Sequence, residues 1–213
     1  MATPRCMYWV ESGRLAGSCI PKSLDELRGI WESGIRRILV LPEDHEIAKH
    51  WGDKSSYFDS LYLADLKPLH IPVRTGSLPT MVQLVDMLRW VEGAPSLVHG
   101  IDGIIRTGTV AASWLIVERG VSARKAIEII ESLRPGSLQG YPQRKFLMEI
   151  EGMSDEIRKQ IGAKPRGVAL VNGELLAAAR RPQRHLVHVQ NYSAVRLAHF
   201  TRPLGSARAT RTR

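Results

Sequence analysis

The sequence predicts an α/β fold in which a central, mainly parallel sheet is covered by helices on both faces. Short apolar segments, several of them β-branched, alternate along the chain with longer segments of helical periodicity. Strands of this apolar kind are typical of a sheet that is buried on both faces. The alternation of such strands with helices favours parallel strands joined by helical connections.

Four segments are predicted to be strands. Residues 36–42 (RRILVLP) are β-branched and apolar, and they end at a proline. Residues 7–10 (MYWV) are expected to form a short edge strand. Residues 68–73 (PLHIPV) and 96–99 (SLVH) are expected to form buried strands.

Helices are predicted between and after these strands, and their ends carry recognisable signals. Ser23 is a candidate N-cap with Glu26 three residues later, and Gly34 ends that helix. Gly120 ends a largely apolar helix, and Ser122 begins the next one. The predicted helices span residues 21–34, 44–54, 55–66, 77–93, 107–119, 122–133 and 141–152.

The chain of 213 residues divides by composition into a body and a basic extension. We expect residues 1–152 to form one domain and residues 153–213 to form a basic, partly disordered C-terminal extension. Residues 165–213 hold nine arginines, no lysine and one acidic residue, Glu174, and Asn-Gly within 168–176 predicts a hairpin. This segment suggests weak attraction to nucleic acid or another polyanion.

Other features exclude several classes of protein. No apolar run approaches the ~20 residues of a membrane span, and the N-terminus lacks the apolar core of a secretory signal. We therefore expect a cytoplasmic location and no membrane partner. The two cysteines, Cys6 and Cys19, do not predict a disulfide framework or a zinc site, and we interpret them as buried or incidental thiols. No metal and no cofactor are expected.

Residues 98–109 (VHGIDGIIRTGT) contain the candidate functional residues of the chain. The strand 96–99 ends in a glycine-spaced segment, here called the glycine loop (residues 100–106), and a helix follows it. A strand, a glycine-rich loop and a helix N-terminus in succession form an anion cradle from backbone N–H groups. The loop lies at the carboxyl end of a predicted parallel strand, where ligands bind in such folds.

The glycine loop and its flanks resemble the signature of cysteine-dependent protein tyrosine phosphatases: His-Cys, five residues, Arg, then Ser or Thr. The chain is most similar to small archaeal tyrosine or dual-specificity phosphatases over roughly residues 7–152. The matching blocks, in the family's order, are MYWV, RILVLPEDHEI, HWGDK, PLHIPV, VHGIDGIIRTGT and RPGSLQGYPQRKFL. This resemblance implies a tyrosine phosphatase-like fold for the body.

The resemblance also implies roles for individual residues. Arg106 corresponds to the phosphate-binding arginine, Thr107 to the hydroxyl residue after it and Gly103 to the glycine at which the loop turns. His99 corresponds to the histidine before the nucleophile, although a core histidine is an equally good interpretation. Gln139 corresponds to the glutamine that positions water. The predicted phosphate-binding residues are Ile101, Asp102, Gly103, Ile104, Ile105, Arg106 and Thr107.

Three positions depart from the family pattern. Gly100 stands where the nucleophilic cysteine belongs, and Thr75 stands where the aspartic acid that protonates the leaving group belongs. Ile105 replaces a small residue and is expected to crowd the loop.

The neighbouring acids do not replace what is missing. Asp102 is a poor nucleophile for phosphate because its charge repels the incoming anion. Asp65 precedes its strand, at the end away from the site. Glu43 and Asp44 either border the site or cap a helix.

The leading hypothesis is therefore a pseudophosphatase that binds phosphorylated protein or another phosphate ester without turnover. Its class by resemblance is that of phosphoric monoester hydrolases, and we expect no activity. One alternative is an active protein-tyrosine phosphatase whose nucleophile has been replaced in this sequence, although three separate departures argue against it. A second alternative is polyanion binding by the arginine-rich C-terminal segment.

Overall fold

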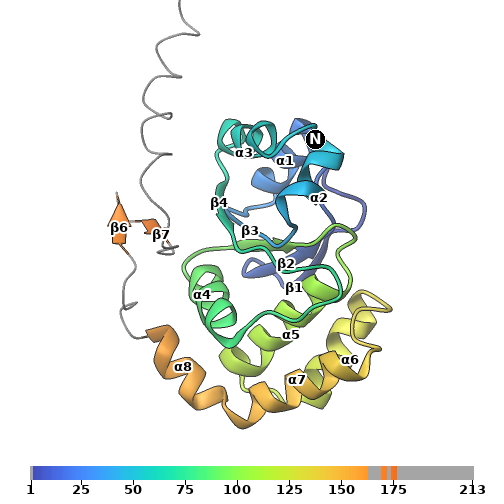
Figure 1. The fold of residues 1–213 in the computed structure, drawn as a ribbon, viewed down its shortest axis with the longest axis vertical. Coiled ribbons are helices and arrows are strands. Elements are labelled where there is room, and N and C mark those ends of the chain that lie inside the picture. The colour runs from blue at the N-terminus through green and yellow to red at the C-terminus, as the bar shows by residue number, and fades with distance from the viewer. Residues whose placement is uncertain (1, 163–168, 172–173, 177–213) are drawn as a thin grey trace, which may run out of the picture.

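The computed structural model describes residues 2–162, 169–171 and 174–176 of the chain (Figure 1). Its main sheet has five strands in the order β1-β2-β5-β3-β4. The strands are β1 (Tyr8–Glu11), β2 (Leu15–Ser18), β3 (Arg37–Val40), β4 (Lys67–His70) and β5 (Ser96–His99). The helices are α1 (Leu24–Glu32), α2 (Asp44–Trp51), α3 (Lys54–Leu63), α4 (Met81–Glu92), α5 (Ile105–Arg119), α6 (Ala123–Leu133), α7 (Tyr141–Gly152) and α8 (Ser154–Gly162).

Strand β5 occupies the centre of the sheet, with β2 and β3 parallel to it on either side. Ser18 of β2 and Val40 of β3 both pair with His99 at the carboxyl end of β5. Strand β4 continues the parallel arrangement beside β3, and β1 is antiparallel to β2 at the opposite edge. The carboxyl ends of four parallel strands therefore meet at one edge of the sheet, as the sequence predicts.

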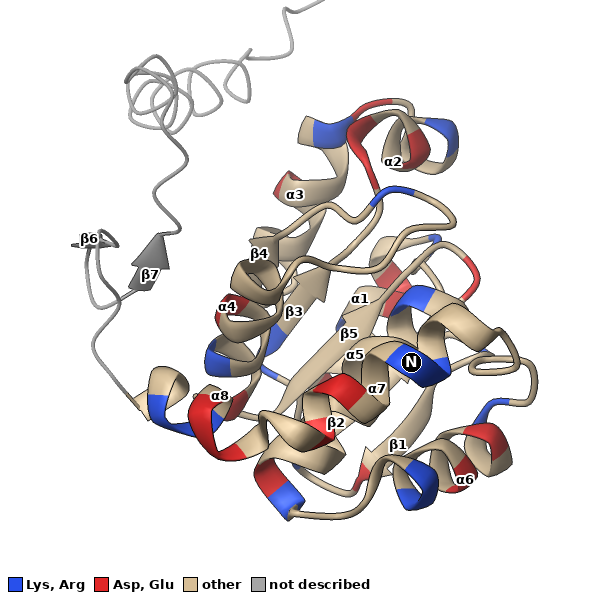
Figure 2. Ribbon diagram, turned by 60° about the horizontal axis from the view of Figure 1, so that its bottom comes forward, with Lys and Arg blue, Asp and Glu red and all other residues tan. Residues whose placement is uncertain are grey.

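Two helical layers enclose the sheet. Helices α1, α2 and α3 cover one face and α4 to α8 cover the other (Figure 1). Successive residues of one strand serve the two cores, because Leu97 packs with the first layer and Val98 with the second. Most charged residues lie on helices and loops, and the buried strands β2 and β5 carry none (Figure 2). The predicted α/β sheet flanked by helices is confirmed.

Most predicted elements are present, with small shifts of their ends. The N-caps predicted at Ser23 and Ser122 accept backbone N–H groups of Glu26 and Lys125. The segment expected as a buried strand at residues 68–73 instead forms β4, an edge strand whose residues are only partly buried or exposed. Its position at the edge explains the difference, because no further strand covers its outer side.

The sequence does not predict β2, although this strand is fully buried. Its residues, LAGS, have low intrinsic strand propensity. A Cβ on Gly17 would lie 2.4 Å from Cζ of Tyr8 on the neighbouring strand, so a larger residue would displace the Tyr8 ring. Tertiary packing, rather than local propensity, thus places β2 beside the central strand.

Cys6 and Cys19 form a disulfide, which corrects the expectation of two separate thiols. The bond joins the residue two before β1 to the residue directly after β2, with 5.9 Å between the Cα atoms. The two cysteines are 13 residues apart in the sequence. A crosslink that closes a loop of this size raises the free energy of unfolding by about 3 kcal/mol on chain-entropy grounds. The antiparallel pairing of β1 and β2 brings the two cysteines together.

The chain continues beyond α7 into α8, which packs against the α4–α5 side of the molecule. Ile157 is buried there, and the guanidinium of Arg89 donates to the carbonyls of Gln160 and Ile161. The predicted hairpin is confirmed as the antiparallel pair β6 (Ala169–Val171) and β7 (Glu174–Leu176). The arginine-rich residues 177–213, for which we predict weak order and polyanion binding, lie outside the described residues. Within the described ranges, no helix has both the length and the apolar character needed to cross a membrane.

We expect Leu97→Ala to destabilise the fold by about 2–5 kcal/mol, because Leu97 is fully buried in the central strand. Denaturant unfolding followed by circular dichroism measures this change. The matched control is Leu63→Ala, where the leucine is 65% exposed and a change within about 0.5 kcal/mol is expected. Equal effects of the two substitutions would contradict the placement of β5 at the centre of the core.

Candidate functional site

The glycine loop connects the carboxyl end of β5 to the first turn of α5, as the sequence predicts. It turns at Gly103, whose φ of +70° lies in the left-handed region that favours glycine. A Cβ on Gly103 would also lie 2.5 Å from the carbonyl carbon of Ser18. The loop is therefore seated against the end of β2, and only glycine fits at the contact.

Gly100 is buried, and its absent side chain would point at the predicted phosphate-binding groups. A Cβ built on Gly100 would lie 3.8 Å from Nε of Arg106 and 3.3 Å from Oγ1 of Thr107. The backbone N–H of Gly100 donates to that same hydroxyl at 2.8 Å. The loop thus brings Gly100, Arg106 and Thr107 together.

The guanidinium of Arg106 is held from one side by a carboxylate. Nη1 and Nη2 donate to the two carboxylate oxygens of Glu46 at 2.7 and 2.9 Å, and Nη1 also donates to the carbonyl of Val73 at 2.9 Å. A guanidinium has five N–H donors. The two that remain, on Nε and on the other side of Nη2, make no hydrogen bond among the described residues and form the edge nearest Gly100. This free edge has the geometry for bidentate binding of an oxyanion.

Glu46 is the site residue that the sequence does not reveal. It lies in the first turn of α2, where it also accepts the N–H of Glu43 at 2.8 Å and the hydroxyl of Thr75 at 2.7 Å. Burial opposes its ionisation, but the hydrogen bonds from Arg106, Glu43 and Thr75 outweigh burial and lower the pKa of Glu46 to about 2. The carboxylate therefore stays charged at neutral pH.

Glu43 and Asp44, which the sequence left open as site or capping residues, do not contact Arg106. Glu43 is the N-cap residue of α2, and Asp44 pairs with Lys54 at 2.9 Å. The local sequence does not distinguish Glu46 from these two acids, because acidic residues are common in the first turn of any helix, where they interact favourably with its N-terminus.

His99 is fully buried and held by two hydrogen bonds. Its Nδ1 bonds the carbonyl of Gly100 at 3.1 Å, and its Nε2 bonds the hydroxyl of Tyr57 at 2.7 Å. Burial lowers the pKa of His99 to about 4 and raises the pKa of Tyr57. The neutral ring consequently donates a hydrogen bond from Nδ1 to the carbonyl of Gly100 and accepts one at Nε2 from the hydroxyl of Tyr57. His99 fixes the entry to the loop as a satisfied core histidine.

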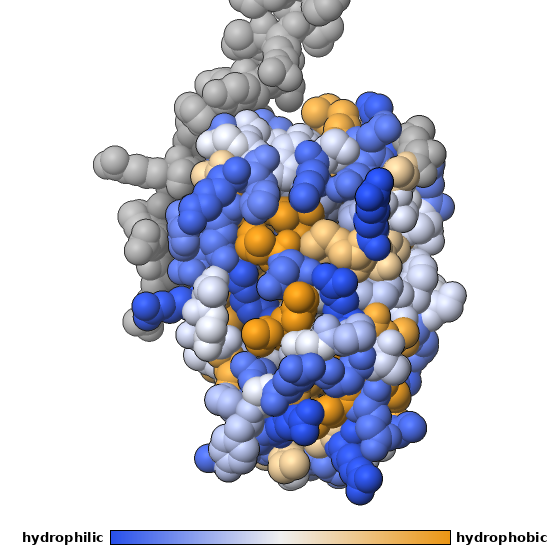
Figure 3. Space-filling model, turned by 90° about the vertical axis from the view of Figure 1, so that its right-hand side faces the viewer, coloured by the Kyte–Doolittle hydropathy of each residue, from blue (hydrophilic) through white to orange (hydrophobic). Residues whose placement is uncertain are grey.

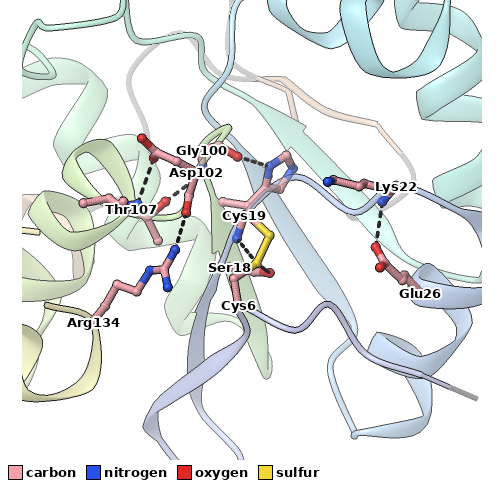
Figure 4. Close-up of a disulfide and its surroundings, with 11 residues drawn as sticks. Cys6, Ser18, Cys19, Lys22, Glu26, Gly100, Asp102, Thr107 and Arg134 are labelled. Atoms are coloured by element: carbon pink, nitrogen blue, oxygen red, sulfur yellow. Dashed lines mark hydrogen bonds between the residues drawn. A yellow bond between two sulfur atoms is a disulfide. The ribbon is translucent and has the colours of Figure 1, made fainter. Parts of the chain in front are cut away.

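Asp102 contacts the loop itself rather than a second catalytic group. Its Oδ1 accepts the N–H of Ile104 at 2.9 Å, and its carbonyl accepts Nη2 of Arg134 at 2.9 Å (Figure 4). Arg134 begins the segment after α6. In the same segment, a Cβ built on Gly136 would lie 4.0 Å from Cγ2 of Ile104. The segment that leads to Gln139 therefore packs beside the glycine loop.

The other predicted residues take different positions around the loop. Gln139 is exposed, and its side chain makes no hydrogen bond among the described residues, whereas Gln143 is buried. Ile105 does not crowd the loop as expected, because its side chain is 41% exposed at the start of α5. Asp65 lies before β4, at the edge of the sheet opposite the site, as predicted. Figure 3 shows apolar groups gathered near the middle of one face within a polar surround.

The arrangement supports anion binding but lacks the groups for covalent catalysis. Gly100 provides no nucleophile. Thr75 is engaged as a donor to Glu46, and an alcohol is too weak an acid to replace a carboxylic acid in protonating a leaving group. What remains is a guanidinium edge, the N-terminus of α5 and a buried hydroxyl.

We expect Glu46→Gln to lower stability by about 3 kcal/mol at neutral pH, because it leaves the buried Arg106 charge without its carboxylate. The pKa of Glu46 is lowered by folding, so its contribution is complete above about pH 4.5 and is lost as the pH falls towards 2. Unfolding free energies measured across this range should show that slope in the parent and not in the variant. Asp44→Asn, which removes an exposed acid of the same helix, is the control. A parallel pH dependence in parent and Glu46→Gln would contradict the assignment.

Comparison with known proteins agrees with this geometry. The sequence model of a family described as the Swiss Army Knife protein DSP-PTPase phosphatase domain matches residues 4–154. The tyrosine-protein phosphatase cdc-14 of Caenorhabditis elegans is 33% identical over 76 residues, which cover 35% of this chain. The match spans only 11% of the length of cdc-14.

Solved structures show the same fold. The active form of Tk-PTP is similar with a TM-score of 0.60 and 29% identity, covering 70% of this chain and 97% of Tk-PTP. Kinase associated phosphatase, in a form whose catalytic-site cysteine is replaced by serine, has a TM-score of 0.60 at 20% identity over 66% of this chain and 87% of its own. The sheet order, the glycine loop and the extent of the family match together place this chain in the DSP-PTPase phosphatase domain family.

Proposed function

We propose that this protein is a pseudophosphatase, which binds a phosphate monoester in the glycine loop without hydrolysing it. The observation that carries the proposal is the free guanidinium edge of Arg106, which faces a residue with no side chain at Gly100. The ligand is the phosphate group of a phosphorylated protein or of another phosphate ester. The tyrosine and dual-specificity relatives support this class of ligand.

The groups around the loop favour binding over turnover. Arg106 and the N-terminus of α5 supply positive charge and N–H donors for the phosphate oxygens. The route through a phosphocysteine is closed by Gly100, and protonation of the leaving group is not supported at Thr75. The alternative of an active phosphatase with one replaced residue requires the remaining machinery to be complete, and the altered position 75 argues against it.

We expect the parent protein to bind inorganic phosphate or tungstate in calorimetric titrations and Arg106→Ala to weaken binding about tenfold or more, because two charge-assisted hydrogen bonds are lost. Because Arg106→Ala also leaves Glu46 unpaired, a second variant, Glu46→Gln/Arg106→Gln, removes both charges. Circular dichroism confirms that each variant is folded. The matched control is Arg124→Ala, whose arginine side chain is 89% exposed on α6. Unchanged binding in both folded site variants, or no binding by the parent, would exclude the proposal.

We expect no hydrolysis of p-nitrophenyl phosphate by the parent and weak hydrolysis by Gly100→Cys. The new Cβ would lie 3.3 Å from Oγ1 of Thr107, so this hydroxyl has to move by a few tenths of an ångström to admit the side chain. The missing general acid should keep the rate about 10²–10⁴-fold below that of a complete enzyme. Gly100→Ala is the control, since it adds the Cβ without the sulfur. Hydrolysis by the parent above background would overturn the pseudophosphatase assignment, and full activity of Gly100→Cys would favour the replaced-nucleophile alternative.

A further inference from the structure

The Cys6–Cys19 disulfide lies directly beside the glycine loop (Figure 4). Cys19 is the residue after β2, and its backbone N–H donates to Sγ of Cys6 at 3.1 Å. Both cysteines are partly exposed. The bond attaches the N-terminal segment to the end of the strand next to β5.

The backbone around Cys19 forms the wall against which the glycine loop rests. The N–H of Ile20 donates to the carbonyl of Ile101 at 3.2 Å. A Cβ on Gly103 would lie 2.6 Å from the backbone nitrogen of Cys19, so the two backbones are in direct contact there. Residues 18–20 thus contact the loop at both Ile101 and Gly103.

The disulfide adds a covalent tie to the strand pairing and packing that hold the Cys6 end of β1. This strand is at the edge of the sheet, and its ladder with β2 is irregular between Trp9 and Glu11. The hydroxyl of Tyr8 is buried and has no hydrogen-bond partner among the described residues. The ion pair between Glu11 and Arg119 holds the opposite end of the strand, away from the loop. At the end of β1 that adjoins the loop, the disulfide is the covalent tie beside the pairing of Tyr8 with Gly17.

We propose that the Cys6–Cys19 disulfide is a reducible clasp that positions the glycine loop, so that its reduction by a dithiol lowers the affinity of the loop for oxyanions. The proposal rests on the anion binding proposed above. In the reaction, the thiolates of the dithiol attack the protein disulfide in two exchange steps. The S–S bond of the protein breaks and that of the cyclic reductant forms, and Cys6 and Cys19 become thiols by taking up two protons and two electrons.

The test compares the oxidised and the dithiothreitol-reduced protein in two measurements. Calorimetric titration with tungstate should show that reduction weakens binding about threefold or more, since the loop loses its preorganisation. Amide hydrogen exchange without any anion should show a larger acceleration at residues 18–20 and 101–104 than in α4 after reduction, beyond the general loss of stability that removal of the crosslink causes. The second readout does not depend on anion binding, so it separates failure of the clasp from failure of the proposed function.

Two variants complete the design. Cys6→Ser/Cys19→Ser should behave like the reduced parent and should not respond to dithiothreitol. Glu11→Gln loosens β1 at the end away from the loop, and it should leave tungstate affinity and its response to reduction unchanged. Equal loop exchange in the oxidised and reduced parent would overturn the proposal, as would equal tungstate affinity in a parent that binds tungstate. Uniformly faster exchange, including in α4, would likewise overturn it by showing a global effect on stability.

Discussion

The paired charges of Arg106 and Glu46 join three parts of the chain that are far apart in sequence. Glu46 comes from the first turn of α2, Arg106 from the first turn of α5, and the carbonyl of Val73 from the connection that leads to α4. Both charged side chains are largely buried, which is tolerable only because each satisfies the other. The guanidinium is thereby fixed in one orientation, with its unused edge towards Gly100.

This pair also determines how the site attracts an anion. Glu46 remains ionised and offsets the charge of Arg106, so the local net charge is small even though the arginine is correctly oriented. An oxyanion in the loop would depend on directed N–H donors, from the guanidinium edge and the first turn of α5, more than on the net charge of the site. Asp102 adds a negative charge at the exposed rim and already occupies the N–H of Ile104. In the binding mode that we propose, recognition would therefore depend on the geometry of these donors.

The sequence predicts those parts of the fold that local chemistry determines. The apolar strand β5, the turn at Gly103 and the capped helices follow from residue type and spacing, and the family resemblance points to Arg106 and Thr107. Three features depend on contacts between distant segments and are not predicted: strand β2, the role of Glu46 and the disulfide. Strand β2 consists of weak strand formers, and its place depends on Tyr8 packing over Gly17. Glu46 has the same local pattern as a capping acid.

The disulfide belongs to the same group of unpredicted features and follows from one of them. Two cysteines separated by 13 residues carry no geometric information unless the strands between them are known. Once β2 pairs antiparallel with β1, the residues flanking the hairpin lie within bonding distance. The pairing of β1 with β2 brings the two cysteines together, so the disulfide is not predictable unless β2 is predicted first.

The structure of the loop does not depend on the side chain that the family uses for catalysis. The N–H of Gly100 is satisfied by Thr107, and its carbonyl is satisfied by His99, whose neutral ring is in turn held by Tyr57. Gly103 fixes the turn against β2, and Glu46 fixes the arginine. Since none of these contacts involves the atoms that a cysteine would add at position 100, losing the sulfur removes a reactive group without removing a structural one. The pseudophosphatase that we propose is therefore compatible with this loop, because nucleophilic chemistry and loop architecture rest on separate sets of atoms.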